Sequence, residues 1–285
     1  KRNLLMSTNL SPYEKKVLQE IEKWKHPEED GFFGKLISIV NKPIDKAGEL
    51  VLDLPGVGDV IKKVVSGITS ICNDAAQFSV RQDAIIEDFK SKGCNVSCIS
   101  DIQKLPLEKV DEVVGYLAAK YKGLAAAEGA GTGLLGLPGI APDLLAIISM
   151  NLRAIGEYCC YYGFNNDVQE ERLFAMNVLS YASSAGDATK GSIMASLVKI
   201  SKDVAAKKSW KKIEEHAMVK VIKKLAESLG VRLTKAKLAQ IIPIAGAAVG
   251  GGFNAYYTSN VCEAASFLYR ERFLANKYGE EIVID

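Results

Sequence analysis

Helical periodicity runs through almost every segment of this 285-residue chain, and it is the feature that most restricts the fold. Residues 13–26 follow Ser11 and Pro12, a helix cap and a first-turn proline, and place their apolar residues on one helix face. Similar spacing recurs from residue 57 to the last segments, whereas only "EEIVID" at 280–285 suggests a strand. We therefore predict an all-α, multi-helix globular bundle.

Length and composition fit one large soluble-type domain. Apolar residues make up 48% and charged residues 25% of the chain, which argues against disorder and against a polytopic membrane protein. We predict a single helical domain over 1–285, in which 1–103 forms an N-terminal accessory helical layer on a core of 104–285. The first residues, "KRNLLMSTNLSPYEKK", lack the apolar core of a signal peptide, so we expect a cytoplasmic protein.

Few residues carry the spacing of a known catalytic or metal motif. The six cysteines are too scattered for a disulfide framework, and Cys94 and Cys98 lack the second pair that a zinc site would need. Both histidines, His26 and His216, lie among lysines and glutamates, as solvated surface residues do. We expect no cofactor.

The glycine run "GTGLLGLPG" at 131–139 has the Gly-x-Gly-x-x-Gly spacing of a dinucleotide-binding loop. Such a loop follows a strand and opens a helix, but here a helical pattern precedes it, and Pro138 and Pro142 should interrupt the helix after it. We interpret the run as a tight connection whose bare backbone lets helices approach closely. The packing glycines would be Gly133 and Gly136, facing Gly246 and Gly250 of a second glycine-rich block.

That second block, 241–262, contains 22 residues without a charge, nominally enough to cross a bilayer. Pro243, four glycines and several polar residues make it a mediocre span, which favours a buried helix. A membrane-inserted or interfacial helix stays open. We predict that both glycine-rich apolar blocks are helical and packed in the core.

Several polar residues stand out because their surroundings are apolar: Glu128, Asp143, Arg153, Glu157 and Asn254. Asp143 and Glu157 share a helix stripe, and Arg153 precedes Glu157 by one turn. The structural interpretation is a buried network in which Arg153 pairs with Glu157. The alternative is a carboxylate site, with Glu128, Asp143 and Glu157 as metal ligands or as acid and base, and with Arg153 orienting a carboxylate.

Positive charge is concentrated between residues 199 and 237, where twelve Lys or Arg face four Asp or Glu. A solvated helix face explains such a stretch, and docking on anionic lipid with Trp210 at the interface is the alternative. Nucleic-acid binding is disfavoured because arginine is scarce. The residues predicted for a membrane or partner face are Lys207, Lys208, Trp210, Lys211, Lys212, Lys220, Lys223 and Lys224.

The two glycine-rich blocks also carry a family resemblance. Glu128-Gly129, the Gly133 and Gly136 spacing, Asp143 and "LRAI" at 152–155 recur with Tyr162-Gly163, and later with Pro243, Gly246-Ala247, Gly250 and Asn254. This pattern resembles the bacterial EcsC protein family, named after a gene beside an ABC-transporter pair. The resemblance covers most of the chain and implies a cytoplasmic, membrane-peripheral accessory role, with no catalytic residues to carry over.

Three functional hypotheses follow. The first is a non-enzymatic accessory protein that associates with an anionic membrane surface, or with a membrane protein such as a transporter, through its basic face and glycine-packed helices. The second is a hydrolase or metal-dependent enzyme built on the carboxylates. The third is a helical protein that binds an apolar ligand, such as a lipid, near 131–148 and 241–258.

Overall fold

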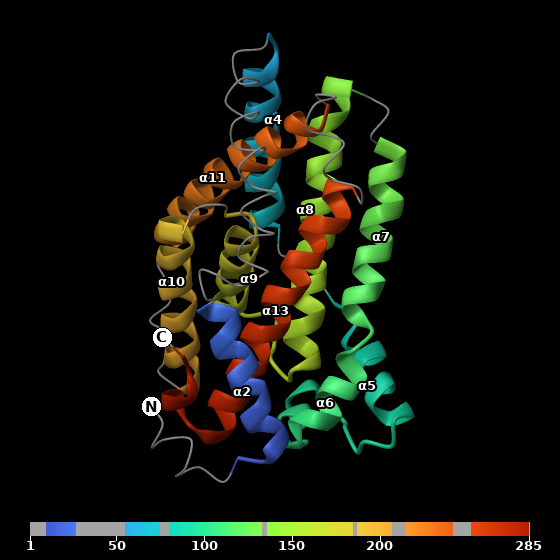
Figure 1. The fold of residues 1–285 in the computed structure, drawn as a ribbon, viewed down its shortest axis with the longest axis vertical. Coiled ribbons are helices and arrows are strands. Elements are labelled where there is room, and N and C mark those ends of the chain that lie inside the picture. Colours follow the sequence, from blue (N-terminus) through green and yellow to red (C-terminus); the bar gives the residue numbers. More distant parts are fainter. Residues whose placement is uncertain are drawn as a thin grey trace.

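Ten α-helices and two 3-10 helices form the described part of the chain in a computed structural model (Figure 1). The structure describes residues 10–26, 55–74, 80–132, 136–184, 187–206, 215–241 and 252–284. The α-helices are α2 (Pro12–Lys25), α4 (Val57–Asn73), α5 (Gln82–Ser91), α6 (Leu107–Val114), α7 (Leu117–Thr132), α8 (Gly136–Tyr161), α9 (Gln169–Ala182), α10 (Asp187–Ala205), α11 (Glu215–Ile241) and α13 (Phe253–Tyr278), and the 3-10 helices are η2 (Ile99–Lys104) and η3 (Glu280–Ile282). These residues contain no strand, so the predicted all-α fold is confirmed.

Helix α13 runs through the middle of the bundle, with α7 and α8 on one side and α9 and α10 on the other (Figure 1). Most of its turns are buried, including Tyr257, Leu268 and Phe273. Helix α2 packs across its C-terminal half, where Trp24 stacks on Phe267 with ring centroids 5.2 Å apart. The division into an accessory layer and a core stays a prediction.

Helix α8 passes through the prolines that were expected to interrupt it, so that expectation was wrong. Pro138 lies in the first turn, where a backbone N–H has no partner within the helix, and Pro142 lies on the exposed side of the helix. One stretch of α8, Gly139–Tyr161, is long and apolar enough to cross a membrane, but 67% of its most apolar window is buried within the bundle. It is the one described helix that is long and apolar enough to cross a membrane, and the buried core helix of a bundle can be equally long and apolar.

Two other segments differ from what the sequence suggests. Helical periodicity continues from residue 105 to 129, but the structure divides this segment at Gly115 and Tyr116 into α6 and α7, because glycine is a weak helix former. Where a strand was predicted at 280–285, the described residues form η3 followed by Val283 in an extended conformation. A single strand needs a neighbour for its hydrogen bonds, and the described residues offer none.

Close backbone approach does occur, at glycines outside the two blocks. A Cβ built on Gly67 of α4 would lie 2.5 Å from Leu145 of α8, and one on Gly230 of α11 would lie 2.6 Å from Val65 of α4. At Gly230 the backbone nitrogen of Val65 would also lie 3.3 Å from that Cβ, so this position favours glycine, whereas at Gly67 only the end of the Leu145 side chain would have to shift. Helices α4, α8 and α11 pack together through these two glycines.

Four helix ends meet at one end of the bundle, which we call the glycine end. There α7 ends and α8 begins, with 133–135 between them, and α11 ends and α13 begins, with 242–252 between them. In Figure 1 the ends of α7, α8 and α13 lie in the upper part of the view. The described helix ends that flank both uncharged stretches therefore lie at the same end of the bundle.

Candidate functional site

Four polar side chains meet at the glycine end, one from each of these helices. We call Glu128 (α7), Asp143 (α8), Lys237 (α11) and Asn254 (α13) the end cluster. The Asn254 amide nitrogen donates to Glu128 Oε2 at 2.6 Å and to Asp143 Oδ1 at 3.0 Å. Lys237 Nζ donates to Asn254 Oδ1 at 2.9 Å and lies 2.7 Å from Asp143 Oδ2. Asn254 thus links both carboxylates and the ammonium group.

Local sequence places each member. Glu128 lies in the last turns of α7, after the alanines 125–127 that keep the helix regular. Asn254 lies in the first turn of α13, two residues after Gly252, whose positive φ of +74° favours glycine. Lys237 Nζ also lies 5.7 Å from the centre of the Phe253 ring, a cation–π distance.

Burial and charge act together on Glu128. Burial raises the pKa of its carboxyl group, and the negative charge of Asp143 raises this pKa further. Asp143 is only 1% exposed, and a buried carboxylate needs partners such as Lys237 and Asn254. Within the end cluster two carboxyl groups face one ammonium group, so a proton on Glu128 is favoured more than in free glutamate.

Glu157 and Arg153 do not join these residues, contrary to the site hypothesis. Glu157 lies 14 residues after Asp143, about 21 Å further along α8, and its oxygen lies 2.7 Å from Lys120 Nζ of α7. Arg153 is exposed. The seven-residue spacing put the acids on one helix face but far apart along it, so the structure brings Glu128 and Asp143 together and leaves Glu157 apart from them.

The distance between Glu157 and Asp143 also means that the three carboxylates of the metal hypothesis do not surround one point. Glu128 and Asp143 come together, but Glu157 is absent from the group. No set of three acidic, histidine or cysteine residues in the described ranges could hold a metal ion. The end cluster is instead a mixed acid, amide and amine network.

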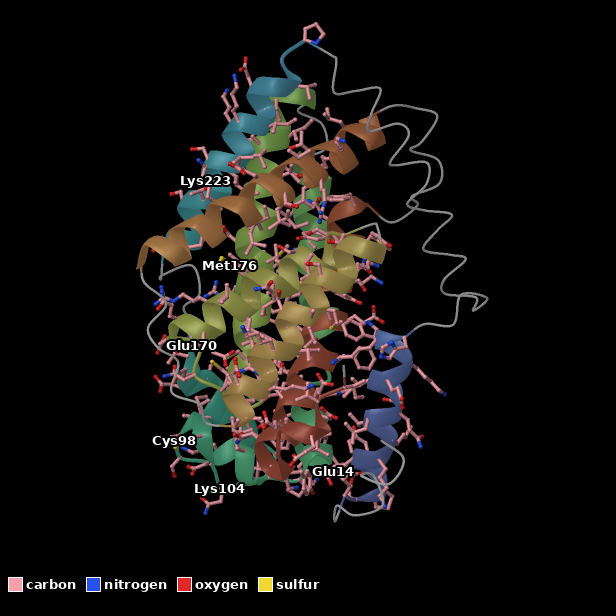
Figure 2. All side chains as sticks on the ribbon, turned by 90° about the vertical axis from the view of Figure 1, so that its left-hand side faces the viewer. Glu14, Cys98, Lys104, Glu170, Met176 and Lys223 are labelled. Carbon is pink, nitrogen blue, oxygen red and sulfur yellow. The ribbon has the colours of Figure 1, made fainter. Side chains whose placement is uncertain are left out.

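Most of the predicted lysine-rich face and of the packing glycines lie outside the described residues. This applies to Lys207, Lys208, Trp210, Lys211 and Lys212, and to Gly133, Gly246 and Gly250. Gly136 is the first residue of α8. Lys220, Lys223 and Lys224 belong to α11, and Figure 2 labels Lys223, which is exposed, on the flank formed by α4 and α11.

The outer surface of α7 near the glycine end is uncharged. Leu124 is 49% exposed, and Glu128, the one charged residue between 123 and 132, is bound to Asn254. No charged residue occurs between 129 and 142. The exposed residues of α7 and α8 on this part of the bundle, which we call the end face, are Gly123, Leu124, Ala126, Ala127, Pro142 and Ala146.

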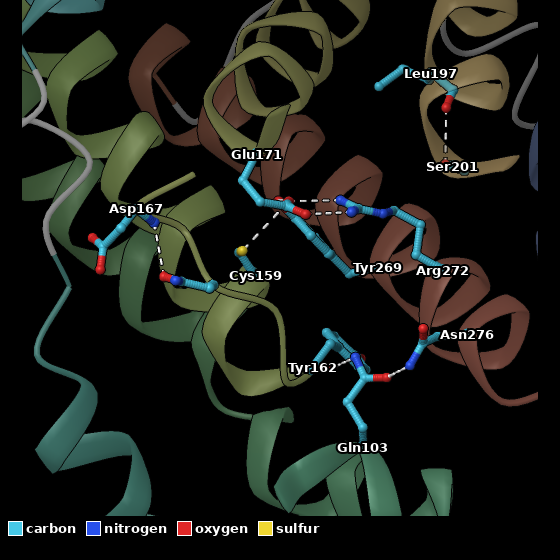
Figure 3. A network of polar contacts seen from close by, with 11 residues as sticks. Gln103, Cys159, Tyr162, Asp167, Glu171, Leu197, Ser201, Tyr269, Arg272 and Asn276 are labelled. Carbon is cyan, nitrogen blue, oxygen red and sulfur yellow. Dashed lines mark hydrogen bonds and ion pairs between the residues drawn. The ribbon is translucent and has the colours of Figure 1, made fainter. Parts of the chain in front are cut away.

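A second ionic network, which the sequence did not indicate, lies in the middle of the bundle (Figure 3). Both terminal nitrogens of Arg272 in α13 donate to the carboxylate of Glu171 in α9. Tyr269 and Cys159 donate to the same carboxylate, at 3.1 and 3.5 Å. Glu171 stands in "QEERLF", which resembles an exposed helix start, and only the aromatic neighbours of Arg272 in "FLYRERF" hinted at its burial.

Lys237 was missed for a related reason. It belongs to the lysine-rich stretch, which was interpreted as one continuous solvated or lipid-facing surface. The structure separates it from that surface, because α11 turns its C-terminal part toward α8 and α13. The long uncharged block that begins at residue 241, soon after Lys237, was the sequence feature that could have indicated a buried position for this lysine.

Comparison with known proteins identifies a family over nearly the whole chain. The model of the EcsC protein family matches residues 15–274. The chain is 25% identical to the protein YdbA of Bacillus subtilis (strain 168) over 265 residues, which is 92% of this chain and 93% of YdbA. It is 27% identical to Protein EcsC of the same organism over 180 residues, which is 63% of this chain and 70% of that protein. No solved structure matches.

Proposed function

The chain belongs to the EcsC protein family, and we propose that it is a non-enzymatic accessory protein that associates with an anionic membrane surface through its glycine end and its lysine-rich stretch. The observation that carries this proposal is the convergence of both uncharged stretches at one end of the bundle. A protein that presents its apolar segments together can direct them at one surface.

The end face adds apolar area at the same place. Leu124 is the most exposed large apolar residue of the described chain, and its exposed neighbours on α7 are alanine and glycine. Small and apolar residues on a helix suit contact with lipid or with another helix. The exposed residues of this face carry no charge, and Glu128 beside them is half-buried and bound to Asn254, so such contact would desolvate one carboxyl group at most.

Charge supports the choice of an anionic surface. Between 199 and 237 the chain has an excess of eight positive residues, from twelve basic minus four acidic. Helix α11 carries part of this excess and ends at the end cluster, so charge and apolar segments lie on connected elements. Each lysine near an anionic surface contributes about 1 kcal/mol of attraction.

The end cluster favours a non-enzymatic role. Asp143 is bound by Lys237 and Asn254, and the third carboxylate of the site hypothesis lies far from it. These contacts join four helices at the base of the two uncharged stretches. The network therefore suits holding the four helix ends together more than it suits attack on a substrate.

Vesicle co-sedimentation tests the proposal. The protein should sediment with phosphatidylglycerol-containing vesicles, bind less at high salt because the charges are screened, and bind little to neutral vesicles. Leu124→Asp should lower the bound fraction about five- to tenfold, since it replaces apolar contact by a charge. Val168→Asp is a matched control, because Val168 is exposed, apolar and outside the glycine end.

Equal binding to neutral and anionic vesicles would refute the anionic-surface proposal, as would an equal loss in the two variants. Binding to native membrane vesicles but not to protein-free ones would identify a membrane protein as the partner instead.

A further inference from the structure

Four polar side chains in the interior have no hydrogen-bond partner among the described residues. They come from four different helices: Asn151 (α8), Ser180 (α9), Thr234 (α11) and Thr258 (α13). None is more than 2% exposed, and Asn151 lacks a partner at both its amide nitrogen and its amide oxygen. Nearly all buried polar groups in proteins are paired, with protein atoms or with ordered water.

Other hydroxyls of this protein show that a partner within the helix is available. Ser184 and Ser201, also buried, donate to the carbonyl oxygen four residues earlier, at 2.7 and 2.9 Å. Ser183 does the same at 2.6 Å. Ser180, Thr234 and Thr258 make no such bond, although they are buried as Ser184 and Ser201 are.

Helix geometry places Asn151, Thr234 and Thr258 further into the bundle than the end cluster. Thr258 follows Asn254 by four residues, Asn151 follows Asp143 by eight, and Thr234 precedes Lys237 by three. These steps correspond to about 6, 12 and 4.5 Å along the helices, with rotations of less than about 90° away from the cluster member. Helices α8 and α13 begin at the glycine end and α11 ends there, so all three steps lead inward.

The fourth residue lies beside the same helices. Ser183 and Tyr257 lie 2.9 Å apart through their hydroxyls, and Arg232 donates to Ser184 at 2.7 Å. The end of α9 therefore contacts α13 at Tyr257, the residue before Thr258, and α11 at Arg232, two residues before Thr234. Ser180 is one turn earlier on α9. Helices α8, α9, α11 and α13 all pack against one another.

We propose that these four helices enclose a buried hydration site, in which internal water molecules complete the hydrogen bonds of Asn151, Ser180, Thr234 and Thr258. Water is the ligand that fits, because the set offers both donors and acceptors and no charge. The site extends the polar end cluster into the core. It stands independently of the membrane proposal.

Matched substitutions test the hydration site through the sign of the stability change. Ser180→Ala and Thr258→Val should each lower the Tm by roughly 2–4 °C, because each removes a hydrogen bond to a buried water. If the hydroxyls were unpaired, the apolar replacements would raise the Tm or leave it unchanged, and the proposal would be overturned. Ser201→Ala is the control, since it removes a hydroxyl of equal burial that bonds to its own helix.

A crystal structure gives the second, direct measurement and does not depend on variant folding. Ordered water within hydrogen-bond distance of Asn151 and of at least one of the three hydroxyls is the expected result. Apolar contacts around Asn151 with no water would overturn the proposal, whatever the variants do.

Discussion

Two ionic networks of this bundle differ in how far they are closed to solvent. In the middle of the bundle one carboxylate, Glu171, meets one guanidinium, Arg272, which lies between the rings of Phe164 and Phe174 at 4.4 and 4.3 Å. At the glycine end Lys237 pairs with Asp143, Asn254 links Asp143 to Glu128, and Glu128 is half-buried. The first network is closed to solvent and balanced, whereas the second is open and holds a carboxyl group of raised pKa.

This contrast separates a structural role from a responsive one. A balanced pair under aromatic rings changes its charge only if the core opens. A carboxyl group of raised pKa beside solvent changes its charge when the pH changes. Substitutions of the same type in the two networks should therefore change the free energy of unfolding by different amounts and with a different pH dependence.

Glu171→Gln should have the largest effect. It leaves the buried guanidinium of Arg272 without its counter-charge, and loss of one partner of a buried pair costs about 3–5 kcal/mol. Urea denaturation at pH 7 measures the loss. The matched control is Glu112→Gln, since the Lys109–Glu112 pair is largely exposed and should leave the unfolding midpoint nearly unchanged. Equal midpoints for the two variants would contradict a structural role for Glu171.

Lys237→Met should have an intermediate effect, about 2–3 kcal/mol at pH 7, because Asp143 then lacks its ammonium partner next to Glu128. The loss should shrink as the pH falls, because the raised pKa of Glu128 lets this carboxyl group take up a proton, which removes a negative charge beside Asp143. Denaturation at pH 7 and at acidic pH tests this, with exposed Lys223→Met as the control. A loss that is independent of pH would show that Lys237 contributes through packing alone.

Glu128→Gln should have the smallest effect at pH 7, within about 1 kcal/mol and toward higher stability, because it removes a charge next to Asp143 but keeps an acceptor for Asn254. The pKa of Glu128 is raised in the folded chain above 4.5, so its protonated form is bound more tightly there than in the unfolded chain. The stability from this group is complete below pH 4.5 and is lost as the pH rises through the raised value. The variant should lack that loss in a pH series of denaturation curves.

Glu14 offers a control of opposite sign. The pKa of Glu14 is lowered despite burial, because the Ser11 backbone N–H, Lys277 and Tyr278 bond to the charged form. The stability from Glu14 is present above pH 4.5 and is lost as the pH falls through the lowered value. Identical pH profiles for Glu14→Gln and Glu128→Gln would contradict the assignment of either shift.

Sequence reasoning predicted the helices well because each one carries its own periodicity. It also singled out Glu128, Asp143 and Asn254, because polar residues in apolar surroundings are visible without any structure. The partner of Asp143 was not visible, since Lys237 stands among many other lysines and only the course of α11 separates it from them.

Two quantities could not be predicted from the sequence: which residues of neighbouring helices lie at the same height along the bundle, and which charged side chains are buried. Glu157 shares a helix face with Asp143, but the position of Lys120 on α7 determines what it contacts. Glu171 and Arg272 are 101 residues apart and stand in charge-rich segments, so their pairing depends on how α9 and α13 pack. Periodicity identifies a face, whereas tertiary packing decides which parts of that face meet.

The contact between α2 and α13 has a consequence for the order of folding. Lys25 at the end of α2 donates to both oxygens of Glu271 and to the carbonyl oxygen of Ile284, and its side chain is 1% exposed. These partners are translated about 250 residues after it. During synthesis α2 leaves the ribosome long before its acceptors exist, so it must wait undocked until α13 emerges. The earliest described helix is thus among the last to find its place, and translation sets the earliest time at which the bundle can close.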